Sequence, residues 1–278
     1  SVIDMPELPE VETVRRSLKL KLIDRKILYC DVYYDNIIEY PSVLEFKKNI
    51  VSQTFRDIKR YGKWLEFILD DYVLFCHLRM EGKFFFKDKD TVRDKHEHVI
   101  FGLDNGIQFR YMDVRKFGKM ELIRKEDIDK MGPLIKIGLE PWDDRLDANY
   151  LRDKFKNKKL PIKSAIMDQS IIAGIGNIYA NEILYASLIN PYKSANDVSI
   201  LELNSIIENT KKILESSIEK GGSTIHSYTS VDGVTGLFQN ELKVHMRGGQ
   251  PCYRCGSIIE KDFIGGRSVY YCPKCQSK

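Results

Sequence analysis

Four cysteines near the carboxyl terminus constrain the fold of this chain more than any other feature. They form two Cys-x2-Cys pairs with sixteen residues between them, made up of Cys252, Cys255, Cys272 and Cys275. This spacing is typical of a zinc site with four thiolate ligands. Because four thiolates complete the tetrahedral coordination of zinc, no position stays open for a substrate or a water molecule. We therefore expect one structural Zn2+ ion rather than a catalytic metal.

The residues between the two pairs have the pattern of a β-hairpin. Residues 257–263 and 268–271 are strand-like, and Gly265-Gly266 forms the turn between them. This turn places Arg267 at the tip of the hairpin. An arginine at such a tip is usually only solvated.

Length, hydropathy and charge limit the class of protein. A chain of 278 residues favours two domains, and a hydrophobic content of 43% is enough for ordinary cores. No run of about 18 apolar residues occurs, and the opening segment lacks the apolar centre of a signal peptide, so we expect a soluble, intracellular protein. Residues 151–278 hold 17 Lys and Arg against 12 Asp and Glu. This positive excess favours a polyanionic partner, although only weakly by itself.

The first half of the chain has mainly strand patterns. Apolar residues recur at helical spacing over residues 11–22, and antiparallel β structure is expected from there to about residue 125. The clearest strand-like segments are residues 64–69, 72–78, 98–103 and 107–111. The last two flank Asn105-Gly106, which is a strong hairpin signal.

The second half has mainly helical patterns. Pro161-Ile162-Lys163 opens one helix, and the turn at residues 173–177 leads into a second. A Gly-rich turn lets backbone N–H groups approach a phosphate, but a lone Gly-x-Gly is weak evidence because it also permits close helix packing. A further helix over residues 200–220 is expected to end at Gly221-Gly222.

The opening stretch, residues 5–12, crowds two prolines and three glutamates into the start of the first helix. Helix capping explains part of this pattern, because Pro9 suits the first turn and Glu10 and Glu12 favour the positive helix N-terminus. Capping does not explain Pro6-Glu7. If processing exposed Pro6, it would carry a secondary amine directly beside an acid. An α-amino group titrates near pH ~8, so much of it is neutral and nucleophilic near physiological pH.

Together these motifs resemble the formamidopyrimidine-DNA glycosylase family, bifunctional enzymes that excise oxidised purines. The resemblance covers nearly the whole chain and is carried by residues 5–12, by the run at residues 167–182 and by the four cysteines. It implies an α+β fold. An N-terminal antiparallel β-sandwich with flanking helices precedes a helical domain that contains a helix–two-turn–helix and a zinc β-hairpin.

The resemblance also implies how the chain is divided. The expected segments are an N-terminal extension (1–5), a catalytic β-sandwich domain (6–130), a linker (131–149), a helix–two-turn–helix DNA-binding domain (150–222), a mobile loop that caps the lesion (223–236) and a zinc-finger hairpin (237–278). An amide nitrogen cannot attack a sugar, so residues 1–5 would block Pro6. We expect them to be a remnant of expression or a misassigned start.

Each candidate residue takes a role from the family. The resemblance implies that Pro6 attacks C1′ of the damaged nucleoside, that Glu7 protonates the sugar ring oxygen, and that Glu10 supports the sugar. Lys63 completes the catalytic set and touches the phosphate beside the reacting sugar. The other implied residues are Lys163, Asn177 and Arg267 on backbone phosphates, Met80, Arg115 and Phe117 as a wedge in the extruded state, and Glu81 for lesion recognition.

Two alternatives stay open. An enzyme of the same superfamily that removes oxidised pyrimidines would share the amine, the helices and the zinc hairpin, although Leu8 and the loops with Met80 and Phe117 favour the purine enzyme. A non-catalytic zinc-ribbon DNA-binding protein would fit a blocked Pro6.

In either case we expect a monomer that binds double-stranded DNA with oxidised bases or abasic sites. We expect it in the bacterial cytoplasm, associated with the nucleoid. His245-Met246 departs from the tyrosine and glycine more usual in the family, and all five histidines are expected to be structural.

Overall fold

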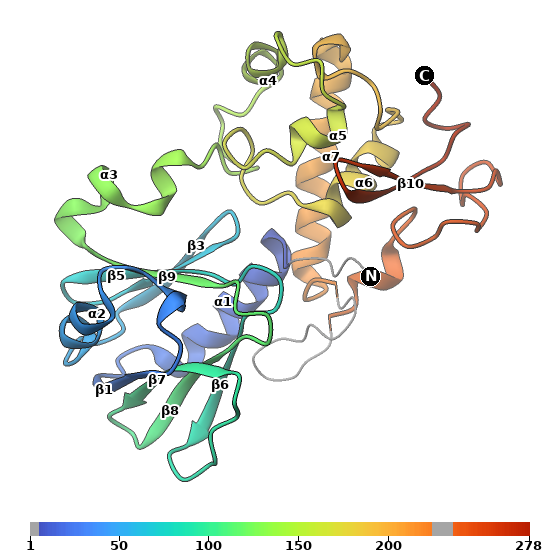
Figure 1. Ribbon diagram of the computed structural model, residues 1–278. Coiled ribbons are helices and arrows are strands. Elements are labelled where there is room, and N and C mark those ends of the chain that lie inside the picture. Colours follow the sequence, from blue (N-terminus) through green and yellow to red (C-terminus); the bar gives the residue numbers. More distant parts are fainter. Residues whose placement is uncertain (1–5, 224–235) are drawn as a thin grey trace. The chain divides into compact units, whose positions relative to one another are not determined.

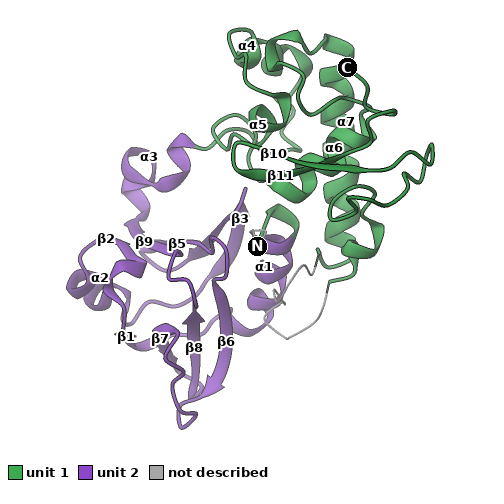
Figure 2. Ribbon diagram, turned by 45° about the vertical axis from the view of Figure 1, so that its right-hand side comes forward, with its two compact units in different colours: residues 1–9, 137–226, 236–278 green, residues 10–136, 227–235 purple. Residues whose placement is uncertain are grey.

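The computed structural model describes residues 6–223 and 236–278, which form two compact units (Figure 2). The sheet unit consists of residues 10–136, and the helical unit consists of residues 6–9, 137–223 and 236–278 within the described part of the chain. Strands dominate the first unit, and helices with one zinc-type hairpin dominate the second. The predicted α+β fold is therefore confirmed.

The sheet unit contains two sheets that share one core. One has the strand order β1-β7-β8-β6 and the other β2-β9-β5-β4-β3. The strands are β1 (Ile27–Val32), β2 (Ile38–Tyr40), β3 (Asp57–Tyr61), β4 (Trp64–Ile68), β5 (Tyr72–His77), β6 (Lys83–Asp88), β7 (Glu97–Leu103), β8 (Ile107–Met112) and β9 (Lys119–Arg124). Phe67 of β4 and Phe109 of β8 have ring centroids 5.9 Å apart, so aromatic side chains from both sheets meet between them.

Three helices of the described residues pack against this sandwich. Helix α1 (Leu8–Leu22) buries an apolar stripe of Val11, Val14, Leu18 and Leu22 in the same core, as its helical spacing predicts. Helix α2 (Val43–Ile50) begins at the N-cap Ser42 and packs against β1 and β2 (Figure 1). The short helix α3 (Ile128–Met131) follows β9.

The predicted hairpins are present with small shifts at their ends. Strands β4 and β5 pair antiparallel, as do β7 and β8, where Gly106 has a φ of 81° in the turn. A positive φ is the conformation that the Asn-Gly sequence favours. Strand β6 was not predicted, and it joins the first sheet through β8.

The helical unit packs four helices around an apolar core. They are α4 (Ala148–Phe155), α5 (Ile162–Ile166), α6 (Asn177–Ala186) and α7 (Ile200–Glu219). Helix α7 starts with a capping box of Ser199 and Glu202 and packs along α4 and α6. It ends before Gly221 and Gly222, whose φ angles of 76° and 78° confirm the predicted glycine stop.

The hairpin of the C-terminal part consists of β10 (Glu260–Ile264) and β11 (Arg267–Tyr271). Gly265 and Gly266 both have positive φ in the turn, as predicted. The remaining short elements are the 3-10 turns η1 (Asp35–Ile37), η2 (Lys125–Asp127), η3 (Pro133–Lys136), η4 (Ala195–Asp197) and η5 (Phe238–Glu241). Across the described residues, no helix combines the length and the apolar character that crossing a bilayer requires.

Candidate active site and zinc centre

Glu7 is bound by the N-terminus of helix α6. Its buried carboxylate, which is 1% exposed, accepts backbone N–H bonds from Gly176, Ile178 (2.8 Å) and Tyr179 (3.4 Å). The first N–H groups of a helix have no partner within it and carry positive partial charge, so they stabilise a carboxylate. The turn at residues 173–177, whose N–H groups could approach a phosphate, therefore binds the Glu7 carboxylate of the same chain.

The Gly-rich turn has the shape that this contact requires. Gly174 has a φ of 101°, and a Cβ there would come within 2.5 Å of the Leu8 side chain. Leu8 also donates its N–H to the Gly174 carbonyl at 3.1 Å. Glycine is needed here so that the backbone before α6 can lie directly against the start of the chain, which fixes the buried Pro6-Glu7 pair.

Gln169 braces the same turn and was not identified from sequence. Its amide oxygen accepts the N–H of Gly174, and its amide nitrogen donates to the carbonyl of Ile175, both at 2.8 Å. The only signal for this role was its place in the matching run at residues 167–182.

A cluster of three arginines in the sheet unit surrounds Glu12. The Glu12 carboxylate contacts Arg15 and Arg16 at 2.8 Å and Arg60 at 3.1 Å. Burial alone would raise the pKa of this carboxyl, but the three guanidinium groups outweigh that effect and lower the pKa to about 2. Glu10 is also buried, with 5% of its surface exposed.

Lys63 stands in a turn that this cluster orders. Arg60 donates to the carbonyl of Gly62 at 3.1 Å, and Lys63 follows with only 8% of its surface exposed. His77, which pairs with Trp64 across β4 and β5, is also buried. Burial, followed by the nearby charges of Arg79 and Lys63, lowers the pKa of His77 to about 3. His77 is therefore neutral at physiological pH.

The two loops predicted as a wedge lie at the ends of strands. Phe117 is 49% exposed, and the guanidinium of Arg115 lies 5.3 Å from its ring centroid. A half-exposed phenylalanine under an arginine is not a core residue, which favours the functional interpretation. Met80 and Glu81 in the other loop are described by the structure as well, and Glu81 is half-buried.

In the helical unit, Lys163 and Asn177 meet the zinc hairpin. The ammonium of Lys163, 1% exposed, donates to the side-chain oxygen of Asn177 and to the carbonyl of Ser268 at 2.8 Å. The amide of Asn177 donates to the Ser268 hydroxyl at 3.2 Å. Arg267, directly before Ser268, is exposed. The structure thus brings the three predicted phosphate-binding residues together, with Lys163 beneath the surface.

The four cysteines form a compact site that fits zinc. Their Sγ atoms all lie within 4.8 Å of one another. Thiolates on one tetrahedral zinc lie roughly 3.8 Å apart, given Zn–S bonds of about 2.3 Å. Backbone N–H groups of Arg254 and Cys275 point at the Cys252 and Cys272 sulfurs at 3.4 and 3.3 Å, as is favourable for thiolates. The predicted structural zinc is supported by this cluster.

The unusual His245-Met246 pair is accommodated by local contacts. Glu182 of α6, which is buried, accepts backbone N–H bonds from Lys243, Val244 and His245. The His245 ring shares a 3.0 Å hydrogen bond with Asn181 and packs edge-on against Tyr270. This histidine is therefore structural.

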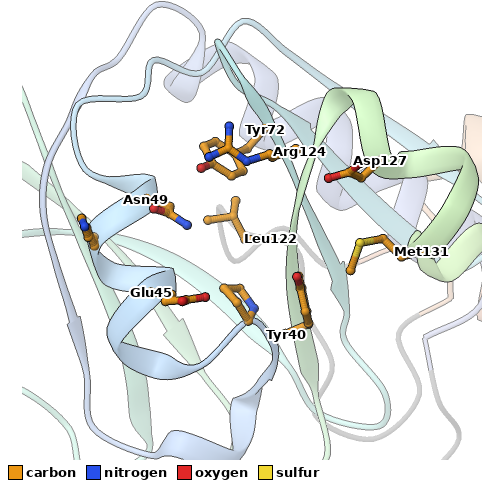
Figure 3. Close-up of a pocket in the computed structure, with 10 residues that line it drawn as sticks. Tyr40, Glu45, Asn49, Tyr72, Leu122, Arg124, Asp127 and Met131 are labelled. Atoms are coloured by element: carbon orange, nitrogen blue, oxygen red, sulfur yellow. The ribbon is translucent and has the colours of Figure 1, made fainter.

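One further hollow lies away from all of these residues. It has a volume of about 300 Å3 in the sheet unit, where Tyr40, Asn49, Tyr72 and Arg124 are among the ten lining residues (Figure 3). None of the predicted site residues lines it. The predicted lesion-capping loop, apart from its end residues, and the extension at residues 1–5 lie outside the described residues.

Family comparisons cover both units. Residues 5–120 match the formamidopyrimidine-DNA glycosylase N-terminal domain, and residues 137–229 match the H2TH domain of the same family. Residues 249–278 match a zinc finger found in FPG and IleRS. A protein named formamidopyrimidine-DNA glycosylase from Bacillus cereus strain ZK is 41% identical, over 99% of this chain and 100% of its own. One of the same name from Oceanobacillus iheyensis is 42% identical, over 98% of each chain.

Solved structures agree with the sequence comparison. Two Lactococcus lactis Fpg complexes, one of a mutant with DNA that contains Fapy-dG and one with DNA that contains an abasic site, superpose with TM-scores of 0.92 and 0.91. Each is 37% identical and covers 98% of this chain and 100% of its own. The resemblance expected from the motifs is confirmed, and the chain belongs to the formamidopyrimidine-DNA glycosylase family.

Proposed function

We propose that this protein is a bifunctional base-excision-repair enzyme. It extrudes and excises oxidised purines such as 8-oxoguanine and formamidopyrimidines, and then cleaves the DNA backbone as an AP lyase. The observation that carries the proposal is the placement of Glu7, which the α6 N-terminus holds directly beside Pro6. Family membership and the DNA complexes of the Lactococcus relatives support the substrate class.

The covalent step uses the nitrogen of Pro6. When residues 1–5 are absent, this nitrogen is a secondary amine that attacks C1′, and the bond to the base breaks as the C1′–N bond forms. The base leaves with the electrons of its bond and takes a proton from solvent. Protonation of the ring oxygen then breaks the C1′–O4′ bond, which opens the sugar and leaves an iminium between Pro6 and C1′. This iminium makes the C2′ proton acidic, so β-elimination and then δ-elimination cut both sides of the sugar and release its two phosphates. Glu10 supports the sugar during these steps.

Glu7 acts as the proton carrier. Its carboxylate is stabilised by three backbone N–H groups, so in the resting state it is ready to accept the proton that a Pro6 ammonium must lose before attack. It then delivers this proton to the ring oxygen of the sugar. Because the helix N-terminus favours the anion, release of the proton to the substrate restores the stable form.

DNA is held through its phosphates and distorted by the wedge. Lys63 and Arg267 contact phosphates near the lesion, and Asn177 contacts one beside the hairpin. Lys163 contacts a phosphate with the ammonium that also donates to the Ser268 carbonyl at 2.8 Å. Met80, Arg115 and Phe117 fill the gap after extrusion, and Glu81 contacts the lesion. The zinc, held by the four cysteines, stabilises the hairpin that presents Arg267.

Two other functions follow from specific observations. A Lactococcus relative has been solved with DNA that contains an oxidised pyrimidine, so activity on that class is the first alternative. If Pro6 stays blocked, the chain is a non-catalytic zinc-ribbon DNA-binding protein. We further propose that it acts as a monomer on duplex DNA in the bacterial cytoplasm, associated with the nucleoid.

An excision assay distinguishes these functions. Protein beginning at Pro6 is incubated in excess over labelled duplexes with 8-oxoguanine opposite cytosine, an oxidised pyrimidine, or no lesion. We expect the fastest cleavage with 8-oxoguanine and a product cut on both sides of the sugar. Faster cleavage of the pyrimidine duplex would reverse the assignment, and binding without any cleavage would establish the non-catalytic alternative.

A further inference from the structure

A buried tyrosine and a buried aspartate join the two loops that carry the wedge residues. Tyr111 on β8 is 0% exposed and Asp113, one residue after that strand, is 1% exposed. The Tyr111 hydroxyl donates to the Asp113 carboxylate at 2.8 Å. Neither residue belongs to the predicted catalytic or DNA-binding set.

Asp113 determines the shape of the loop that carries Arg115 and Phe117. Its two carboxylate oxygens accept the N–H groups of Arg115 (3.2 Å), Lys116 (3.0 Å) and Gly118 (2.8 Å). All three donors lie in this loop, so the carboxylate orders the loop rather than the strands. Its backbone carbonyl is also held, at 2.7 Å from the His98 ring.

Both loops lie directly against the Tyr111 hydroxyl. A Cβ added to Gly118 would be 1.7 Å from this oxygen, and one added to Gly82 would be 2.5 Å from it. Gly82 closes the loop that contains Met80, and Gly118 closes the loop that contains Phe117. A single hydroxyl therefore lies in the contact between the two loops, which are far apart in sequence.

Each loop has the same strained arrangement before its apolar wedge residue. Arg79, directly before Met80, has a φ of 53°, and Lys116, directly before Phe117, has a φ of 61°. L-residues rarely adopt this conformation unless the surroundings enforce it. In both loops a buried side chain accepts the N–H of the strained residue, His77 in one and Asp113 in the other.

We propose that Tyr111 and Asp113 are positioning residues that hold the two loops in one register, so that Met80 and Phe117 enter the DNA together. This inference rests on the proposed function, because the register matters only when an extruded nucleotide leaves a gap. Misplacement of positioning groups by about 1 Å can reduce a rate by ~10²-fold. Loss of one hydroxyl contact is expected to cost about tenfold.

The test compares Tyr111→Phe with wild type, both beginning at Pro6, in single-turnover excision of 8-oxoguanine from duplex DNA. The variant should be about tenfold slower, and a fluorescent base beside the lesion should report slower unstacking. Borohydride trapping on a single-stranded abasic oligonucleotide, which has no gap to fill, should stay within about twofold of wild type. Asp113→Asn is the second variant, because it retains the size of the side chain and should show the same pattern even if Tyr111→Phe folds poorly.

Coupling to the wedge gives a readout that simple damage would not produce. If Tyr111 acts through Phe117, the Tyr111→Phe/Phe117→Ala double variant should excise no more than about twofold slower than Phe117→Ala alone. Tyr29→Phe is the matched control, since it removes a tyrosine hydroxyl bonded to Gln108 in the same unit and should excise normally.

Three outcomes would overturn the inference. They are normal excision by both Tyr111→Phe and Asp113→Asn, equal losses on duplex and single-stranded substrates, and multiplicative losses in the double variant. In each case the proposed function stands if wild type excises 8-oxoguanine. Failure of the unsubstituted protein that begins at Pro6 to excise 8-oxoguanine would refute the proposed function and this inference with it.

Discussion

Replacing Glu7 by glutamine tests both the structure and the chemistry of the opening stretch. Glutamine retains one oxygen acceptor but directs an NH2 group either at the N–H of Ile178 or at those of Gly176 and Tyr179, because the two carboxylate oxygens divide these donors. One buried N–H left without an acceptor costs about 1–3 kcal/mol. Loss of the negative charge at the helix N-terminus adds about 0.3–2 kcal/mol. We expect the start of α6 to be less stable by about 1.3–5 kcal/mol in total.

Amide hydrogen exchange measures this loss locally. Because about 1.4 kcal/mol corresponds to a factor of ten, exchange at Gly176 and Ile178 through local opening should be at least about eightfold faster in Glu7→Gln. Excision of intact 8-oxoguanine should be lost, since proton delivery is removed. Trapping on a preformed abasic site should persist at a reduced rate, because the Pro6 amine remains.

Glu182→Gln is the matched control for this experiment. Glu182 is also a buried carboxylate of the helical unit that accepts three backbone N–H bonds, from Lys243, Val244 and His245. It should lose local stability to a similar extent and still excise 8-oxoguanine. If Glu7→Gln excises as well as this control, the role of Glu7 as proton carrier is refuted.

Three other predictions follow from the same structure. Removal of zinc by a chelator should disorder residues 252–275 and weaken DNA binding, and full DNA affinity in protein shown to contain no metal would contradict this. Arg267→Ala should weaken duplex binding and reduce the slope of log affinity against log salt by roughly one, whereas an unchanged slope would remove Arg267 from the phosphate contacts. Burial raises the pKa of the Glu12 carboxyl, but its arginine partners outweigh burial and lower the pKa from 4.5 to about 2. Solvent screening reduces the corresponding stabilisation to about 1–2 kcal/mol, which is present above pH ~4.5 and is lost as the pH falls toward 2. Glu12→Gln should therefore be less stable than wild type at pH 7 and nearly equal to it near pH 2, and a stability gap that does not change with pH would contradict this.

Local patterns predicted the elements of this fold well. The stripe on helix α1, the Asn105-Gly106 hairpin and the glycine stop after α7 were all predicted because spacing and turn chemistry act over a few residues. The zinc cluster was predicted for the same reason, since each half of it is a local Cys-x2-Cys. Strand β6 was missed although Phe84 packs on Phe109 in the core, because a run of three phenylalanines has no clear alternation.

Contacts between distant segments could not be predicted. The partners of Glu7 lie about 170 positions away, and nothing near Glu7 in sequence marks it as bound by a helix N-terminus. Lys163 is predicted to bind a phosphate, and its hydrogen bond to the carbonyl of Ser268, which is 105 positions away, had no signal in the sequence. Glu12 was assigned to helix capping, because the sequence does not show that Arg60 reaches it from a distant strand. In each case the partner of the charged side chain comes from a distant part of the sequence and is brought to it only by the tertiary fold.

The nucleophile is tested most directly by comparing two amino termini on one labelled duplex with 8-oxoguanine opposite cytosine. One protein begins at Pro6 and the other retains residues 1–5, and both are incubated with borohydride, which reduces an iminium to a stable adduct. The protein that begins at Pro6 should form the adduct, and peptide mapping should place it on Pro6, whereas the longer protein should bind the duplex without forming it. Equal trapping by both proteins would show that another amine attacks the sugar, with Lys63 the first to examine, and would contradict the account of Pro6 as the nucleophile.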